Sequence, residues 1–337
     1  MPQSQWWYSS ENFGTAGVSP LLPTTSAGSE SRSFQAAQRC RVAVEGVWVR
    51  DDVDGMFKGD NDIIVATKFR AGNRPPIDKV HFLESNVPEK RWIPVPFHPE
   101  VFATRDFDAT MADFALEVRV YDEDGLDEGD LSSLTSAMTG ATTAAAVAFP
   151  ALAPYAAFAS GAGGALARLV DTLDEHDKLV QGRILLGINK PASSGYDLFQ
   201  PGFLVCFARD VDASNLVLGE NRQVHTKNGH GAPQRYEHLS YIVLRITRDG
   251  PSSVDMLTTQ KMATLVAELE LGRKGKSTQA LKELAATFET YTAMKRLERY
   301  RELASRADLT REERELLDEL GRDPSVRPYL GLRPPES

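Results

Sequence analysis

Two acidic stretches contain carboxylate side chains whose spacing is suited to binding a metal ion. In the first, Asp54 and Asp60 lie six residues apart, and the apolar run Ile63–Val65 follows at once. Carboxylates on a loop are hard oxygen ligands, and calcium binds about 6–8 oxygens, several of them from carboxylates. A solvated acidic turn is the alternative interpretation, because Asp and Gly also favour turns.

The second acidic stretch follows Phe114–Tyr121, a cleanly alternating run that predicts a strand. It places Asp122, Asp124 and Asp130 at relative positions 0, 2 and 8. If both stretches lie at strand ends, they can meet at one tip of a β-sandwich. Without a cation, so many carboxylates would repel one another and some of their pKa values would rise. A bound divalent ion removes that conflict.

These two stretches resemble the calcium loops of the C2 domain, a calcium-dependent phospholipid-binding module. Asp54 and Asp60 before an apolar strand are similar to the first calcium loop of that family. Val120–Asp124 with Asp130 is similar to the third loop, and Gly182–Leu186 resembles the strand that follows it.

The resemblance covers about residues 38–248 and implies an eight-stranded antiparallel β-sandwich that binds phospholipid when calcium fills its loops. The third loop departs from the family, because about 45 residues intervene before the next strand. The identity of the last ligand, Asp130 or Asp177, therefore stays open. The implied calcium ligands are Asp54, Asp60, Asp122, Asp124 and either Asp130 or Asp177.

The long insertion in the third loop is uncharged from Leu131 to Ala167. Pro150 and Pro154 break it near the middle, which predicts a helical hairpin within residues 131–173. Each helix has about the length needed to cross a bilayer, but Ala, Gly, Ser and Thr favour insertion only weakly. The hairpin either enters a membrane, as in a pore-forming effector, or packs closely within protein.

Short alternating or apolar runs elsewhere predict further strands in a domain spanning residues 38–250. With Phe114–Tyr121 they make about eight, the number expected of an all-β sandwich. The other predicted strands are Arg41–Val49, Ile63–Phe69, Ile77–Leu83, Arg91–Pro96, Gln181–Ile188, Gly202–Arg209 and Leu239–Thr247.

Residues 1–37 are rich in Ser, Thr, Gly and Pro and are predicted to be a disordered arm. Trp6–Tyr8 is the exception within it. Three adjacent aromatic residues either dock on a partner or membrane interface, or pack back on the surface of the domain.

Residues 210–238 resemble a long loop that contains His225, His230 and His238. No carboxylate or cysteine pattern accompanies these histidines, so scattered surface histidines are favoured over a metal site. Cys40 and Cys206 lie in apolar strand-like settings without zinc-site spacing, which favours buried inert thiols.

Past residue 250 the apolar pattern changes to a helical period, which predicts a small C-terminal helical domain over 251–337. Val254–Leu271 is expected to be one helix, and a second is expected from Ser277 to about Arg306. Thr310 and Glu313 have the spacing of a capping box for a third helix that ends near Gly321. The apolar stripe of the second helix is suited to a core or to another chain.

The net charge of −9 argues against nucleic-acid binding, which needs a basic face. There is no Sec-type signal pattern, so we expect a cytoplasmic protein peripheral to the membrane, with export by another route left open. No combination of nucleophile, base and orienting group is present, and we expect no enzyme.

The sequence therefore predicts a mainly β protein that binds phospholipid in a calcium-dependent manner. Its main alternative is a calcium-independent structural or assembly protein, in which the hairpin and the C-terminal helices form a homo-oligomer. A regulatory C2-like module that acts on an enzyme partner is a third possibility.

Overall fold

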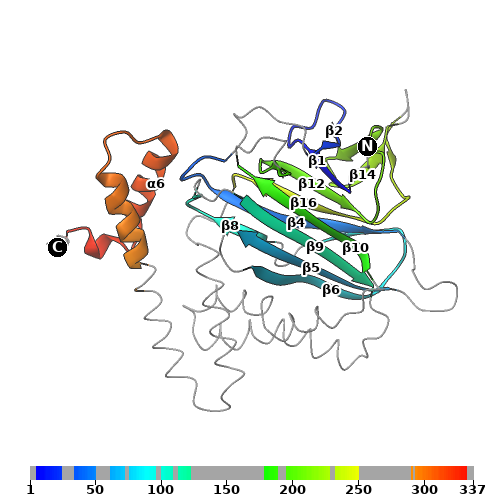
Figure 1. Ribbon diagram of the computed structural model, residues 1–337, viewed down its shortest axis with the longest axis horizontal. Helices are drawn as coiled ribbons and strands as arrows, with labels where there is room; N and C mark the ends of the chain where they lie inside the picture. Colours follow the sequence, from blue (N-terminus) through cyan, green and yellow to red (C-terminus); the bar gives the residue numbers. More distant parts are fainter. Residues whose placement is uncertain are drawn as a thin grey trace, which may run out of the picture.

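The computed structural model shows a mainly β protein with a pair of helices near the C-terminus (Figure 1). It describes residues 5–24, 34–50, 61–72, 76–95, 100–108, 113–122, 178–188, 195–227, 232–249, 290 and 293–331. The predicted insertion at 131–173 and the predicted helix Val254–Leu271 lie outside these residues.

The longest strands form a five-stranded sheet in which all pairs are antiparallel except β10 with β11. Its order is β11 (Asp197–Leu198), β10 (Lys178–Gly187), β9 (Asp113–Asp122), β5 (Asn61–Ala71) and β6 (Ile77–Val87).

A seven-stranded antiparallel sheet joins the N-terminal strands to the last strand of the β region. Its order is β3 (Leu22–Pro23), β1 (Trp6–Ser9), β12 (Gly202–Phe207), β16 (Tyr241–Thr247), β4 (Cys40–Val49) and β7 (Arg91–Pro94), and β8 (Glu100–Thr104) also pairs with β4.

The third sheet has four short antiparallel strands. Its order is β15 (Gln234–Arg235), β14 (Val224–Thr226), β13 (Leu216–Gly219) and β2 (Val18–Pro20).

The five-stranded and seven-stranded sheets share one hydrophobic core. In β9, Leu116 and Val118 are buried in it, whereas Glu117 between them points to the other face, as the period of two in a strand requires. From the seven-stranded sheet, Leu204 and Ile242 enter the same core. We call the three sheets together the β-body.

The seven-stranded sheet is buried on its second face as well. Phe203 and Val205 of β12 and Val243 of β16 belong to a separate aromatic-rich cluster, which also contains Leu216 and Leu218 of the four-stranded sheet. All six residues of β12 are consequently buried.

The prediction of a disordered arm over residues 1–37 is wrong for 5–24 and 34–37. Trp6 pairs with Cys206 and Tyr8 with Leu204, and the side chains of Trp6 and Tyr8 are each 5% exposed. The amide of Gln5 donates to the carbonyls of Gln181 (2.6 Å) and Phe207 (2.8 Å). Of the two alternatives for the aromatic run, packing back on the domain is confirmed. Burial of large aromatic groups offsets the conformational entropy lost on ordering the segment.

The prediction of one long loop over 210–238 is also wrong, because it contains β13, β14 and β15. These strands are two to four residues long, too short to show an alternating pattern in the sequence. Each of the eight strands that the sequence predicts is present, with ends shifted by a few residues.

The C-terminal helical pair consists of a helix over 293–304 and α6 (Arg311–Arg322), followed by the short 3₁₀ helix η5 (Arg327–Tyr329). The predicted capping box is confirmed. The Thr310 hydroxyl accepts from the Glu313 amide (3.2 Å), and the Glu313 carboxylate accepts from the Thr310 amide (2.9 Å). This reciprocal pair satisfies two donors at the start of α6.

Candidate functional site

Asp122 is the predicted calcium ligand that the structure places. It is the last residue of β9, and its side chain is buried at 5% exposure. The other predicted ligands lie outside the described residues: Asp54, Asp60, Asp124, Asp130 and Asp177.

Strand register places the strand ends to which the two acidic stretches attach at the same end of the five-stranded sheet. Ile63 of β5 lies opposite Asp122 of β9, and Lys178 of β10 lies opposite Tyr121. The chain between β4 and β5, residues 51–60, therefore joins the sheet beside the point where residues 123–177 leave it. We call this end, marked by Asn61, Asp122 and Lys178, the acidic end.

The pairing is irregular at two places near the acidic end, although the pairing of β9 with β5 at Asp122 itself is regular. The register of β5 with β6 shifts between Asn61 and Ile63, and that of β10 with β9 shifts between Lys178 and Val180. Such bulges turn side chains away from the regular alternation and are common next to functional sites. They give the acidic end a geometry that a regular ladder would not have.

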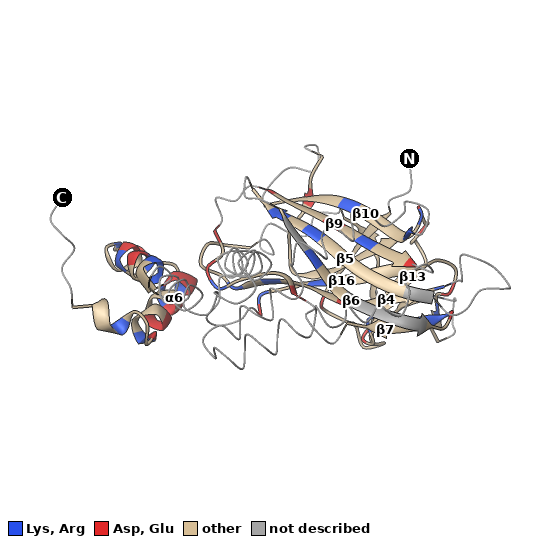
Figure 2. Ribbon diagram, turned by 90° about the horizontal axis from the view of Figure 1, so that it is seen from below, with Lys and Arg blue, Asp and Glu red and all other residues tan. Residues whose placement is uncertain are grey.

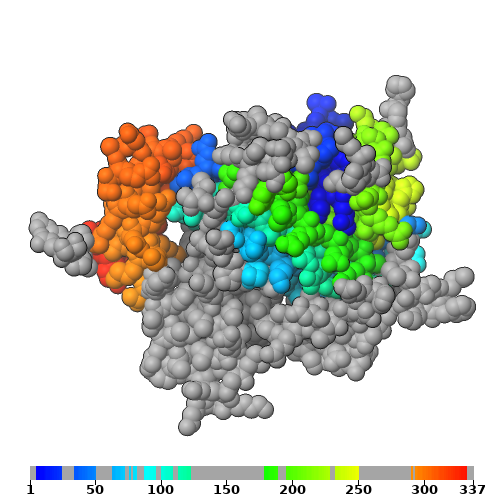
Figure 3. All heavy atoms as spheres, in the orientation of Figure 1, coloured from blue at the N-terminus to red at the C-terminus, as the bar shows by residue number. Residues whose placement is uncertain are grey.

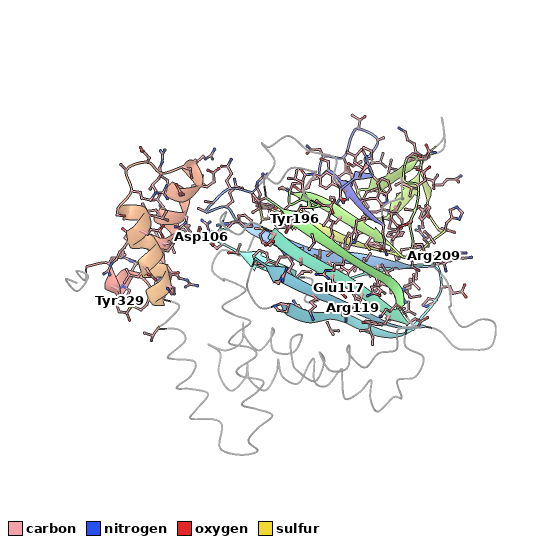
Figure 4. All side chains as sticks on the ribbon, in the orientation of Figure 1. Asp106, Glu117, Arg119, Tyr196, Arg209 and Tyr329 are labelled. Atoms are coloured by element: carbon pink, nitrogen blue, oxygen red, sulfur yellow. The ribbon has the colours of Figure 1, made fainter. Side chains whose placement is uncertain are left out.

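Two other charged residues of β9 near Asp122, Glu117 and Arg119, pair with each other within the strand. Arg119 donates from Nε to Glu117 Oε1 (2.6 Å), and the two side chains lie together on the strand (Figure 4). Burial lowers the pKa of Arg119, but its hydrogen bonds to Glu117 and Tyr121 outweigh that effect and raise the pKa above its ordinary value. Glu117 thus has a specific partner for its charge.

A buried carboxylate fits one ligand of a hard cation, because desolvation disfavours its charged form unless a positive charge or hydrogen bonds compensate. Within the ranges that the structure describes, no group of three or more His, Cys, Asp or Glu side chains is arranged to hold a metal ion. Asp122 is thus the member of the predicted ligand set that lies among the described residues.

Both cysteines are buried, as the sequence predicts, and of the described histidines in 210–238, His238 is exposed and His225 is half-buried. His225 Nε2 lies 3.2 Å from Asn221 Oδ1, and burial, with the charge of Arg235, lowers its pKa. Cys40 and Cys206 are free thiols with 0% exposure, and burial raises the pKa of each well above the ordinary value. Burial therefore disfavours the reactive thiolate form of both. His230 lies outside the described residues.

Sequence reasoning missed a polar group between the two large sheets. Lys79 of β6 is 5% exposed, and its Nζ donates to the carbonyl of Glu100 in β8 (2.6 Å). Thr67 Oγ1 and His81 Nε2 lie 2.7 Å apart, both buried. Burial lowers the pKa of Lys79 to about 8, against an opposing effect of the Glu100 charge. Alternation alone would have assigned these polar side chains to the solvent face.

Comparison of the sequence with known protein families finds no matching family model, and comparison with curated proteins finds no match.

Proposed function

We propose that the protein is a non-enzymatic, calcium-dependent phospholipid-binding protein, built on a C2-like β-sandwich, and that the acidic end is its binding site. The observation that carries the proposal is the register of Asp122 opposite Ile63. It brings the ends of both acidic stretches to adjacent strands, as a calcium site shared between two loops requires.

The remaining ligands of the proposed site come from sequence. Asp54 and Asp60 belong to the stretch that enters β5, and Asp124 follows Asp122 by two residues. A bound calcium ion would supply positive charge and coordination positions that lipid phosphate oxygens can fill. The carboxylates hold that charge at the end of the sheet, in a chain whose net charge of −9 otherwise disfavours anionic lipid.

We propose that the insertion at 131–173 contacts the membrane at the acidic end as well. Asp122 and Lys178, which bound the stretch containing it, lie at the ends of two adjacent strands, β9 and β10. The insertion is therefore tethered at both sides to the acidic end, and we propose that it contacts the bilayer once the acidic end has bound. In the described part of the chain, no helix combines the length and apolarity needed to cross a membrane.

Thermal denaturation with and without calcium tests the ion site. Calcium at 100 times its dissociation constant should stabilise the protein by about 2.7 kcal/mol. Asp122→Asn should remove most of that gain. Asp113→Asn is the matched control, because Asp113 begins the same strand at its opposite end. If calcium leaves the melting temperature of the unaltered protein unchanged, the acidic end is not a calcium site.

Vesicle sedimentation tests the lipid step separately. Vesicles that contain phosphatidylserine should sediment the protein with calcium and not with a chelator, and Asp122→Asn should reduce the bound fraction. The alternative function, a calcium-independent assembly protein, predicts no sedimentation in either condition. It also predicts an oligomer by light scattering after size-exclusion chromatography.

A further inference from the structure

Among the described residues, the C-terminal helical pair contacts the β-body at one restricted place. Figure 3 shows the helical pair in orange at one side of the molecule. The body contributes the segment before β4, with Ala37 and Arg39, and the segment after β8, with Arg105 and Asp106. Asp106 lies on the side of the body that faces the helices (Figure 4).

Charged side chains make most of this contact. Glu319 of α6 accepts hydrogen bonds from two arginines of the body, Arg105 and Arg39; the Arg105 Nε lies 2.6 Å and the Arg39 Nη2 3.3 Å from Oε2. In the opposite sense, Arg299 of the helical pair binds both oxygens of Asp106, at 2.7 and 3.2 Å. Each side of the contact thus contributes both an acid and a base.

The environment of Glu319 favours its ion pairs, whereas burial raises the pKa of Asp106 against the opposing effect of Arg299. The Arg105 side chain is 14% exposed, so less water competes for it than at an open surface. Burial opposes ionisation of Glu319, but the hydrogen bonds and charges of Arg105 and Arg39 outweigh it and lower its pKa. Two-point pairing of an arginine with a carboxylate, as between Arg299 and Asp106, is among the stronger forms of ion pair.

Apolar burial contributes little to the same contact. In the part of the chain that is described, the hydrophobic cluster here takes a single side chain from the body, Ala37. Its other members belong to the helical pair itself: Leu303, Leu309, Leu316, Leu317 and Leu320.

The helical pair also carries its own stabilising contacts. Arg296 pairs with Asp323 (3.0 Å), and Arg306 pairs with Glu313 (2.6 Å), both within this part of the chain. Acidic and basic residues are interspersed along its helices (Figure 2). With its leucine cluster, these contacts allow the two helices to stay together when the contact with the body is lost.

We propose that this contact is an ionic latch, in which Arg39, Arg105 and Asp106 of the body hold the helical pair by charge, so that raised ionic strength releases it as a folded unit. The Debye length shortens from about 10 Å at 0.1 M salt to about 3 Å at 1 M, which weakens partly exposed ion pairs but not apolar cores. Glu319 is the central residue of the latch, because it accepts hydrogen bonds from two arginines, Arg39 and Arg105.

Energy transfer between two dyes on the full-length protein tests the latch. Asn215→Cys on the body and Ala307→Cys between the two helices are exposed positions. Cys40 and Cys206 have 0% exposure and stay unlabelled in the folded protein. Transfer should fall as sodium chloride rises from about 0.1 M to about 1 M, while far-ultraviolet circular dichroism stays unchanged.

Glu319→Gln should weaken docking by about ten- to a hundredfold, the usual effect of losing a hydrogen bond to a charged group, and so lower the salt concentration of release. Glu315→Gln is the matched control, because Glu315 lies on the same helix and pairs only with exposed Arg311 in the described contacts. Asp106→Asn tests the latch from the body side without altering either helix. Salt-independent transfer, or equal behaviour of Glu319→Gln and Glu315→Gln, would overturn the proposal.

Discussion

Gly182 of β10 lies directly over the sulfur of Cys206 in β12, at a point where the two large sheets approach each other closely. A Cβ atom at Gly182 would collide with Cys206 Sγ and with the indole ring of Trp6. The missing side chain therefore sets the spacing of the two sheets beside the N-terminal strand.

Gly182→Ala is expected to destabilise the protein by about 1–3 kcal/mol, because overpacking a dense core forces side chains or backbone to move. Denaturant unfolding followed by tryptophan fluorescence measures the change. Gly331→Ala, where a Cβ meets no atom within 4 Å, is the control and should unfold like the unaltered protein. Equal midpoints for the two variants would mean that the sheets separate there at no cost.

Trp6→Ala should lower stability by about 3–5 kcal/mol, the usual cost of removing a large buried aromatic side chain. The reason is that Trp6 belongs to the core shared by the two large sheets. Leu22→Ala is the control from the same N-terminal region, since Leu22 is 41% exposed. Chemical denaturation of both variants makes the comparison. A stability loss no larger than that of the control would show that the N-terminal strand is dispensable.

The lowered pKa of Lys79 predicts that the free energy of unfolding rises with pH above neutrality. Its pKa is about 8 in the folded protein against an ordinary value of 10.5, so the unfolded chain binds the proton more tightly. Its contribution is present above pH 10.5 and is lost as the pH falls through about 8. Between those limits the effect is at most about 3 kcal/mol.

Lys79→Met keeps the length of the side chain and removes the charge. The unfolding free energy of the unaltered protein, minus that of this variant, should rise between pH 7 and pH 10. Taking the difference cancels the contribution that titration of the buried thiols Cys40 and Cys206 makes to both unfolding free energies, because both proteins contain them. Lys295→Met, at an exposed position in the helical pair, should leave the difference flat. A flat difference for Lys79→Met as well would mean that Lys79 titrates as it does in the unfolded chain.

The strands that the sequence predicted correctly are those with an extended local pattern. β9 alternates buried and less buried positions over most of its length, so its apolar spacing alone identifies it. β1 has four residues in a Ser- and Gly-rich segment, and its partner Cys206 lies 200 positions away in the sequence. No local pattern carries such pairing, which is why the arm was predicted to be disordered.

In the candidate site and the helical pair, too, the local features can be predicted from the sequence and the long-range pairings cannot. The composition of the two acidic stretches is visible in the sequence, but the adjacency of the strand ends to which they attach depends on the register of Ile63 with Asp122. The pairing of Arg105 with Glu319 likewise joins positions 214 apart, and each residue alone is an ordinary surface charge. The capping box of α6 was predicted because Thr310 and Glu313 are local to each other.

The strand β4 connects the ionic latch at one end to the acidic end at the other. It begins at Cys40, next to Arg39 of the latch, and ends at Val49, where the chain enters the first acidic stretch. Ten residues of strand span about 33 Å, and the helical pair lies beyond its first end (Figure 1). If the acidic end faces a bilayer as proposed, the latch and its helices point away from the lipid. A single molecule would then present one pole to the membrane and the other to the surrounding solution, as an adaptor between the two must.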